Sequence, residues 1–242
     1  MSEPGGGLSE AWEDAAREWT TWARSRELDH PFWELNLPAF LELLPPPGRL
    51  TLDVACGEGR LARELVRLGH TVVGVDSSPS LAAAARATEP AFELHVADAT
   101  ALPLEGGTAD LAVAMMALMT VDDMPAVVRE VARVLEPGAR FCIALLHPVA
   151  TWADAGVASY FETARFEKLV TREPGLGSMN FHDVHRPLRE YFDALADAGF
   201  LLERLNEPMP GDAYVESFPE VESWRRAPFL LHLRAVLAPR AA

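Results

Sequence analysis

Lysine occurs only once in this sequence, as Lys168, and the other basic residues are arginines that form no cluster. The chain has 36 acidic residues against 21 basic ones, so its formal net charge is −15. A protein that binds DNA or RNA needs a surface rich in lysine or arginine, because it must displace the counterions of the phosphates. The charge balance therefore argues against nucleic acid as a partner.

Cysteine and long apolar runs are also scarce. The two cysteines lie in apolar stretches typical of strands, so we expect no disulfide framework. No apolar run approaches the roughly 20 residues that span a bilayer. The first ten residues also lack the basic start and apolar core of a signal peptide. We therefore expect a cytoplasmic protein with no membrane partner, either a monomer or a homodimer.

The length of 242 residues suits one large domain. Two helical patterns come first, near residues 8–24 and 32–44, and then short apolar runs alternate with helical patterns. Such alternation is typical of a parallel sheet that helices cover on both faces. The expected strands are residues 50–55, 71–75, 91–96, 110–116 and 141–146, and the expected helices between them are residues 60–68, 80–87 and 123–135.

The alternation stops after residue 146. Residues 147–186 mix glycine, proline, histidine and aromatic residues, and we interpret them as a cap inserted after the fifth strand. A helix at 188–198 and strands at 200–206 and 229–237 follow, and no helical crossover between these strands is long enough to make them parallel. The prediction is a three-layer α/β sandwich with a seven-stranded, mostly parallel sheet and an antiparallel C-terminal strand. We divide this single domain into an N-terminal helical lid (1–48), a core (49–146), the cap (147–186) and the C-terminal part of the sheet (187–242).

A glycine turn and two acidic residues lie where three successive strands of the predicted sheet end. Asp53 lies on the first strand, just before the turn Gly57-Glu58-Gly59, and Asp76 and Asp98 end or follow the next two strands. Glycine lets the backbone approach a ligand closely, and an acid at the end of the second strand can accept hydrogen bonds from ribose hydroxyls. Ligands of open α/β sheets bind outside the carboxyl ends of the strands. Together these features predict a nucleotide-containing cofactor at this edge.

Each feature by itself also has a purely structural explanation. The glycine turn could be a tight connection, Asp76 could cap the next helix, and Asp98 could make local turn bonds. The cofactor class is also open, because residues 57–62 match the dinucleotide fingerprint G-x-G-x-x-A. An NAD(P)-dependent reductase is therefore an alternative, although Tyr160 lies eight residues from the single lysine and cannot form the common Tyr-x-x-x-Lys pair.

Five stretches of the chain also carry a family resemblance. They are Asp53-x-x-Cys56-Gly57-x-Gly59, Val73-Gly74-Val75-Asp76-Ser77-Ser78-Pro79, Ala97-Asp98-Ala99-x-x-Leu102-Pro103, Ala109-Asp110-Leu111-Ala112-Val113 with Met115-Met116, and Arg129-Glu130-Val131-x-Arg133-Val134-Leu135-Glu136-Pro137-Gly138. Together they resemble the motifs of class I S-adenosylmethionine-dependent methyltransferases, in the branch that includes ubiquinone and menaquinone methyltransferases. The resemblance covers roughly residues 50–146 and the terminal strand pair.

The resemblance implies a Rossmann-like fold, S-adenosylmethionine as cofactor with S-adenosylhomocysteine as product, a small-molecule acceptor and no metal. A second alternative is a cofactor-binding regulatory subunit that has lost catalysis, because decay of the acceptor site is not visible in one sequence. The implied cofactor residues around the methionine half are Asp53, Ala55, Gly57 and Gly59, with Ala55 standing where many members have glycine. The implied residues at the ribose are Asp76 and Ser77, those at the adenine are Asp98 and Ala99, and those at the sulfonium are Met115 and Met116.

The acceptor side is less well marked. His147 directly follows the fifth strand and is the first candidate base, although it could simply begin the cap. His182 and His185 are the next candidates, for a substrate contact or a structural role. As a pair they are too few for a zinc site. Tyr160 and Tyr214 are further candidates that nothing ranks.

The N-terminal region contains four of the six tryptophans. These aromatic residues either pack on the domain, as we favour for Trp12, or form a lid. In a lid, Trp19 or Trp22 would lie beside the sulfonium, because an aromatic face attracts a cation. The same arrangement would make Arg24 and His30 candidate partners for the methionine carboxylate.

Overall fold

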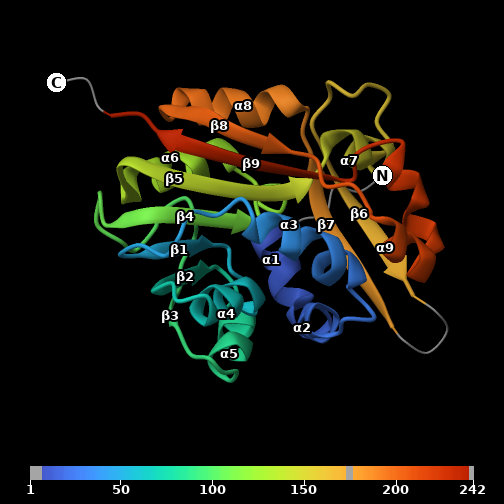
Figure 1. Ribbon diagram of the computed structural model, residues 1–242, viewed down its shortest axis with the longest axis horizontal. Helices are drawn as coiled ribbons and strands as arrows, with labels where there is room; N and C mark the ends of the chain where they lie inside the picture. Colours follow the sequence, from blue (N-terminus) through green and yellow to red (C-terminus); the bar gives the residue numbers. More distant parts are fainter. Residues whose placement is uncertain (1–6, 173–176, 240–242) are drawn as a thin grey trace.

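A seven-stranded sheet runs through the middle of the molecule, in the order β3-β2-β1-β4-β5-β9-β8 (Figure 1). The computed structural model describes residues 7–172 and 177–239. The first five strands are parallel, and β9 is antiparallel to both of its neighbours, β5 and β8. The predicted seven-stranded, mostly parallel sheet with an antiparallel C-terminal strand is therefore confirmed. The strands are β1 (Thr51–Val54), β2 (Val72–Asp76), β3 (Glu93–Val96), β4 (Ala109–Met115), β5 (Leu135–Leu146), β8 (Phe200–Asn206) and β9 (Leu230–Leu237).

Helices cover both faces of this sheet because alternate side chains of its central strands point to opposite sides. On β4, Ala112 and Ala114 share one core with residues of α6 (Met124–Val134) and α8 (Leu188–Asp197). Leu111 and Val113 belong to a second core, on the side of α4 (Arg60–Arg67) and α3 (Leu37–Leu41). The helix between β2 and β3 is α5 (Pro79–Arg86).

The fifth strand is longer than the sequence predicts. We expected it at 141–146, but β5 begins at Leu135, directly at the end of α6. The Glu136-Pro137-Gly138 segment ends the helix as expected, yet it lies inside the strand, where the register against β4 shifts between Ala109 and Leu111. Such an irregularity accommodates proline and a glycine at φ +84°, which a regular ladder would not.

The remaining elements gather at the carboxyl ends of the parallel strands, on the right in Figure 1. The N-terminal part contributes α1 (Leu8–Asp14), α2 (Ala16–Arg24) and η1 (Phe32–Asn36), ahead of α3. The inserted segment consists of α7 (Pro148–Ala155) and an antiparallel pair, β6 (Ala164–Thr171) and β7 (Ser178–His185). Between β8 and β9 lie two short helices that the sequence did not predict, α9 (Asp212–Ser217) and η2 (Pro219–Arg225).

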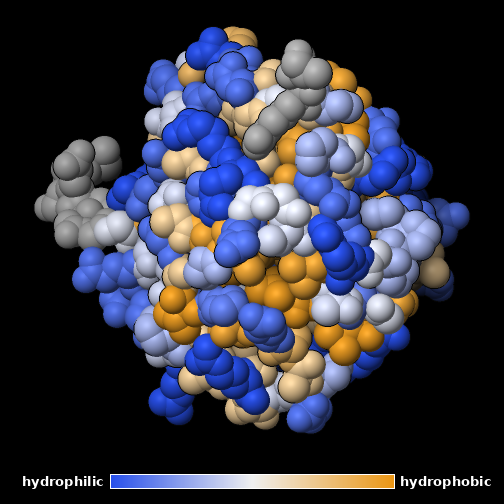
Figure 2. All heavy atoms as spheres, turned by 90° about the vertical axis from the view of Figure 1, so that its left-hand side faces the viewer, coloured by the Kyte–Doolittle hydropathy of each residue, from blue (hydrophilic) through white to orange (hydrophobic). Residues whose placement is uncertain are grey.

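The opposite side of the molecule carries none of these covering elements. Figure 2 looks onto this side, near the amino ends of the parallel strands, and shows mainly hydrophilic residues around smaller apolar patches. Within residues 7–172 and 177–239, no helix has the length and apolar character that crossing a bilayer requires.

A buried pair joins the last strand to the N-terminal helices. His232 on β9 is fully buried, and its Nε2 lies 2.8 Å from Oδ1 of Asn36 in η1. The ring of Phe40 in α3 packs edge-on against the imidazole. Burial lowers the pKa of His232 to about 4, so the imidazole is neutral in the folded protein at neutral pH.

This burial predicts a loss of stability in acid. Between pH 6.5 and about 4, the unfolded chain binds a proton at His232 that the folded protein does not. The contribution of His232 to the free energy of unfolding is therefore complete above that window and falls by about 2–3 kcal/mol as the pH drops through it. Urea denaturation at several pH values would measure this, and His232→Gln should lose less stability than the wild type. Equal losses in both proteins would contradict the assignment.

Candidate active site

A cavity of about 780 Å³ lies at the carboxyl ends of the parallel strands. Strand ends, the N-terminal helices, the inserted segment and the residues before β9 all contribute to its wall. Most of the predicted cofactor residues meet in this wall: Trp22, Asp53, Ala55, Gly57, Asp76, Ser77, Asp98, Ala99, Met115 and Met116. Two of them, Arg24 and Gly59, are not among the lining residues.

Asp76 ties the end of β2 to the glycine turn that follows β1. Its Oδ2 accepts a 2.7 Å hydrogen bond from the Gly57 N–H, and its Oδ1 accepts a 2.9 Å bond from the Ser78 N–H. Asp76 is buried, and burial raises the pKa of its carboxyl group. Both oxygens keep a free lone pair, because a carboxylate has about four acceptor positions. The predicted ribose contact is therefore compatible with the bonds that Asp76 already makes.

The turn itself needs left-handed backbone at three positions. Gly57 and Gly59 have φ +58° and +81°, and Ala55 has φ +51°. An L-residue with a Cβ pays roughly 1–2 kcal/mol in this region, which explains why glycine is common where this chain has Ala55. A Cβ on Gly59 would come within 2.7 Å of the Phe92 ring, so this glycine allows close packing of the turn rather than a ligand contact.

Asp53 is the clearest sign of a missing binding partner. Its carboxyl is buried in the cavity wall, and its Oδ2 has no hydrogen-bond partner. Burial, together with the nearby Asp76, raises the pKa of Asp53 to about 8. A ligand that brings a positive charge or a donor would remove the cost of this unpaired acceptor. The ammonium and sulfonium groups of S-adenosylmethionine have that chemistry, so the residues present fit the implied cofactor.

The whole wall is acidic, which also suits a cationic ligand. Its basic residues are Arg60, Lys168 and Arg172. Its acidic residues are Asp29, Asp53, Glu58, Asp76, Asp98, Asp122, Asp123, Asp154 and Asp183.

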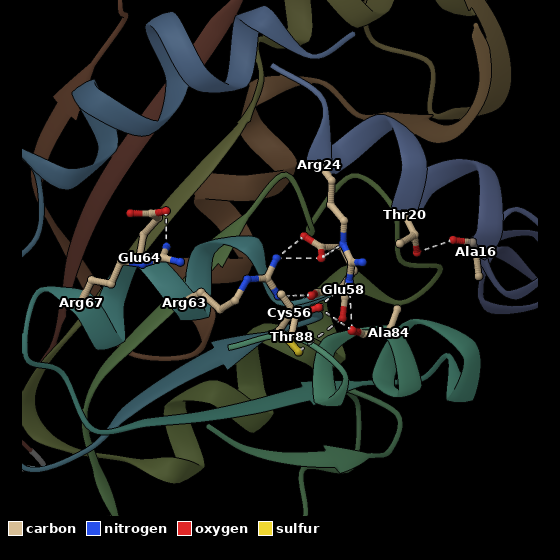
Figure 3. Close-up of polar contacts among 11 residues, drawn as sticks. Ala16, Thr20, Arg24, Cys56, Glu58, Arg63, Glu64, Arg67, Ala84 and Thr88 are labelled. Carbon is tan, nitrogen blue, oxygen red and sulfur yellow. Dashed lines mark hydrogen bonds and ion pairs between the residues drawn. The ribbon is translucent and has the colours of Figure 1, made fainter. Parts of the chain in front are cut away.

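Arg24 lies outside this wall and supports the glycine turn from behind. Its Nε lies 3.0 Å from Glu58, and its Nη2 donates to the Ala84 carbonyl and the Thr88 hydroxyl (Figure 3). Glu58 is almost completely buried and also receives two bonds from Arg63, at 2.8 and 2.7 Å. Arg24 therefore fastens α2 to the turn and to α5, and its placement does not support the predicted contact with the methionine carboxylate.

Arg60 is the basic residue that sequence reasoning missed. It begins α4 directly after the glycine turn and lines the cavity. Its guanidinium lies 3.5 Å from the ring centre of Phe32 and 4.8 Å from that of Trp19, and its Nη1 pairs with Asp29 at 2.6 Å. The first position of a helix is usually exposed, so only its place beside the glycine turn could have marked it in the sequence.

The N-terminal tryptophans cover the cavity. Trp12, Trp19 and Trp22 all belong to its lining, although for Trp12 we had favoured simple packing. The Trp12 indole donates a 3.0 Å bond to the His182 carbonyl, which connects α1 to β7. Glu13 in α1 accepts hydrogen bonds from Ser78 and Ser80 at the start of α5. These contacts join α1 to β7 and to the start of α5.

The three predicted catalytic histidines are not among the lining residues. His147 caps α7, where its Nδ1 accepts from the Val149 N–H, and its Nε2 lies 3.2 Å from Glu207. His182 faces Glu167 at 3.4 Å. His185 is fully buried and bonded to the Thr151 hydroxyl and the Tyr160 carbonyl. A catalytic role for them stays a prediction that these positions do not favour, and the residue between the last two, Asp183, does line the cavity.

Tyr160 and Tyr214, the other candidates for the acceptor side, are also not among the residues that line the cavity. Tyr214 bonds to His30 at 2.7 Å, and the His30 ring stacks on Phe218, so His30 joins the N-terminal region to α9 rather than facing the cofactor. The Tyr160 hydroxyl accepts from the Leu188 N–H. Across the part of the chain that the structure describes, no group of three or more His, Cys, Asp or Glu side chains could hold a metal ion.

Comparison with known proteins identifies the family. A model described as a methyltransferase domain matches residues 52–143. The ubiquinone biosynthesis O-methyltransferase of Xanthomonas axonopodis pv. citri is 30% identical over 188 residues, which are 74% of this chain and 75% of that protein. A crystal structure of an S-adenosylmethionine-dependent methyltransferase from Mesorhizobium loti has the same fold, with a TM-score of 0.66, 24% identity and coverage of 89% and 99%. The chain belongs to the S-adenosylmethionine-dependent methyltransferases.

Within this methyltransferase, the match to the family model spans the strands from β1 to β5 and stops before the inserted segment. The ubiquinone/menaquinone biosynthesis C-methyltransferase of Caulobacter vibrioides is 31% identical over 134 residues, which are 50% of this chain and 52% of that protein. The chain thus spans about half the length of several curated relatives that it matches. Family membership supports the sulfonium cofactor and gives no support to the dinucleotide alternative.

The network around Glu58 predicts that substitutions at Glu58 and at Arg24 lower the free energy of unfolding by different amounts. Glu58→Gln should lower the free energy of unfolding by about 3 kcal/mol, because it leaves the buried Arg63 guanidinium without its counter-ion. Arg24→Met should cost at most about 1 kcal/mol, since its side chain is 40% exposed. Chemical denaturation measures both values. Calorimetry should also find unchanged S-adenosylhomocysteine affinity in Arg24→Met, and a large loss there with stability retained would restore Arg24 as a cofactor residue.

Proposed function

We propose that this methyltransferase transfers the methyl group of S-adenosylmethionine to a small molecule that occupies the cap side of the cavity. The observation that carries the proposal is the meeting of Asp53, Asp76 and Asp98 in one cavity wall, with a buried Asp53 oxygen left unpaired. A volume of about 780 Å³ lies in the range of small-molecule sites. Relatives named for ubiquinone and menaquinone biosynthesis support an acceptor of that class.

The strand-end residues would hold the cofactor. Asp76 would accept hydrogen bonds from the ribose hydroxyls, and Asp98 would accept from the adenine amino group beside Ala99. Asp53 would face the ammonium of the methionine part, and Arg60 its carboxylate. When bound, S-adenosylmethionine supplies an electrophilic methyl group on a positively charged sulfur.

The covering residues would position the reaction and exclude water. Displacement at a methyl carbon needs the attacking atom in line with the bond that breaks, so orientation is the main contribution of the protein. The rings of Trp19 and Trp22 attract cations. Met115 ends β4 and Met116 follows it, and both would lie at the boundary between the cofactor and the acceptor. We further propose that the protein acts in the cytoplasm on a free small molecule rather than on nucleic acid, since its net charge is −15.

Parallel calorimetric titrations with S-adenosylmethionine, S-adenosylhomocysteine and NADH test the cofactor assignment. We expect micromolar binding of the first two and none of NADH. Asp76→Ala should weaken S-adenosylhomocysteine binding by about tenfold or more, because it removes the ribose acceptor and the anchor of the Gly57 and Ser78 N–H groups.

A matched control is Asp193→Asn, an exposed acid on α8 outside the cavity, which should bind like the wild type. Binding of NADH alone would show that the glycine turn holds a dinucleotide. Unchanged affinity in Asp76→Ala would place the ribose elsewhere.

A further inference from the structure

The hairpin of β6 and β7 presents one of its faces to the cavity. Phe166, Lys168 and Val170 on β6 line the wall, as do Arg172 directly after this strand and Phe181 and Asp183 on β7. Phe166 and Asp183 are direct cross-strand partners. The Val184 N–H donates a 2.8 Å bond to the Met119 carbonyl, so β7 runs beside the loop that follows β4. This hairpin lies outside the residues that match the family model.

Asp183 lies in that face, and its buried carboxyl group has no hydrogen-bond partner in the part of the chain that the structure describes. Only 3% of the residue is exposed, although it lines the cavity. Among residues 7–172 and 177–239, no hydrogen bond or salt bridge to its carboxylate is found. A desolvated carboxylate without a donor is costly. Its position therefore indicates that a ligand supplies the missing contact.

The charged neighbours of Asp183 do not supply that contact. Lys168 on β6 pairs with Asp154 on α7, at 2.6 Å from Nζ to Oδ2. Arg186 donates to the carbonyl oxygens of the loop after β4, and Tyr191 on α8 is linked to Arg186. His185 on the same strand is bonded to Thr151 and to a carbonyl. Of these groups, Asp183 is the cavity-lining carboxylate without a salt bridge to any described residue, so both of its oxygens can contact the methyl acceptor.

Burial and the neighbouring charges also determine the protonation state of the Asp183 carboxyl group. Burial and the nearby Asp154 raise the pKa of Asp183 to about 7, and Lys168 offsets part of the effect. A base is most effective when its pKa lies near the working pH, because it can then both accept and release a proton. At neutral pH the carboxyl is close to half ionised.

We propose that Asp183 accepts the proton of the methyl acceptor, and that this acceptor is an aromatic compound with a hydroxyl group. The inference rests on the proposed methyl transfer. The hydroxyl oxygen forms the bond to the methyl carbon, its proton moves to the Asp183 carboxylate, and the electron pair of the broken carbon–sulfur bond stays on sulfur. The products are a methyl ether, the thioether and a protonated Asp183, which releases its proton to solvent.

The rest of the wall on this side provides an apolar surface for an aromatic ring. Its apolar members on this side, which would enclose a ring, include Met119, Phe166, Val170, Phe181, Trp224 and Phe229. A neutral hydroxyl keeps a lone pair for the attack on the methyl carbon and carries the proton that Asp183 accepts, whereas a protonated amine has no lone pair to attack with.

The test measures binding of 4-methylphenol by NMR titration to protein saturated with S-adenosylhomocysteine. This probe has the ring and hydroxyl of a tyrosine side chain and a pKa near 10, so it stays neutral throughout. In the wild type, affinity should rise about tenfold between about pH 6 and about pH 8, as Asp183 ionises. Asp183→Asn should bind at the weak, low-pH level at both pH values.

Two further variants separate this role from a structural one. Asp154→Asn removes a like charge and should move the rise in affinity to lower pH, which a damaged fold would not do. Asp193→Asn, on the outer face of α8, should behave as the wild type. Thermal melting and S-adenosylhomocysteine affinity in each variant show that it is folded.

A pH-independent affinity in the wild type, or the same pH dependence in Asp183→Asn, would overturn the proposal. No binding of 4-methylphenol, or preferred binding of 4-methylbenzylamine, would overturn the hydroxyl acceptor. Failure of the wild type to bind S-adenosylhomocysteine would instead count against the proposed function, so the two results are distinguishable.

Discussion

The Asp76 carboxylate holds together the two strand ends on which the cofactor half of the site depends. By accepting the Gly57 and Ser78 N–H groups, it fixes the glycine turn after β1 against the end of β2. Both N–H groups belong to irregular backbone beside a cavity, where an unpaired donor would be costly. The same carboxylate lies close enough to Asp53 to raise its pKa. One side chain thus links the shape of the turn to the electrostatics of the pocket.

Three separate segments of the chain enclose the site: the N-terminal helices, the β6–β7 hairpin and the residues before β9. The N-terminal helices are tied to α5 through Glu13 and to the glycine turn through Arg24 and Glu58. The β6–β7 hairpin is tied to α1 by the Trp12 indole. These polar contacts are joined by a buried apolar cluster in which Trp22 and Leu28 pack with Met179 of β7. The N-terminal helices and the hairpin therefore form one continuous cover that excludes water from the site.

The two halves of the cavity use buried acids in different ways. In the proposed cofactor half, Asp53 would face the ammonium group and Asp76 would accept from the ribose hydroxyls, so ligand binding would stabilise the charged forms of both carboxylates. In the acceptor half, Asp183 lies among aromatic and aliphatic side chains, and burial holds its pKa near 7. Burial is the largest cause of the raised pKa at all three residues, and the chemistry of the expected ligand distinguishes them.

The proposed cofactor half could be predicted from the sequence because it depends on local order. Asp53, Asp76 and Asp98 lie at or next to the carboxyl ends of three strands, and parallel strands bring these ends to one edge whatever surrounds them. The acceptor half could not be predicted in this way. Period-two alternation places Phe181, Asp183 and His185 on one face of β7, yet it does not say which face turns inward.

That choice depends on contacts distant in the sequence, such as the pairing of Asp183 with Phe166, the Val184 bond to Met119 and the Trp12 bond to His182. Asp183 therefore lines the cavity while His182 and His185 beside it do not, and Arg60 lines it while Arg24 does not. The sequence by itself determined the sheet, the order of its strands and helices along the chain and the edge where we propose the cofactor, because these follow from local periodicity and strand ends. Only the tertiary structure decided which polar groups of the inserted segment line the cavity, because packing between distant segments orients the hairpin.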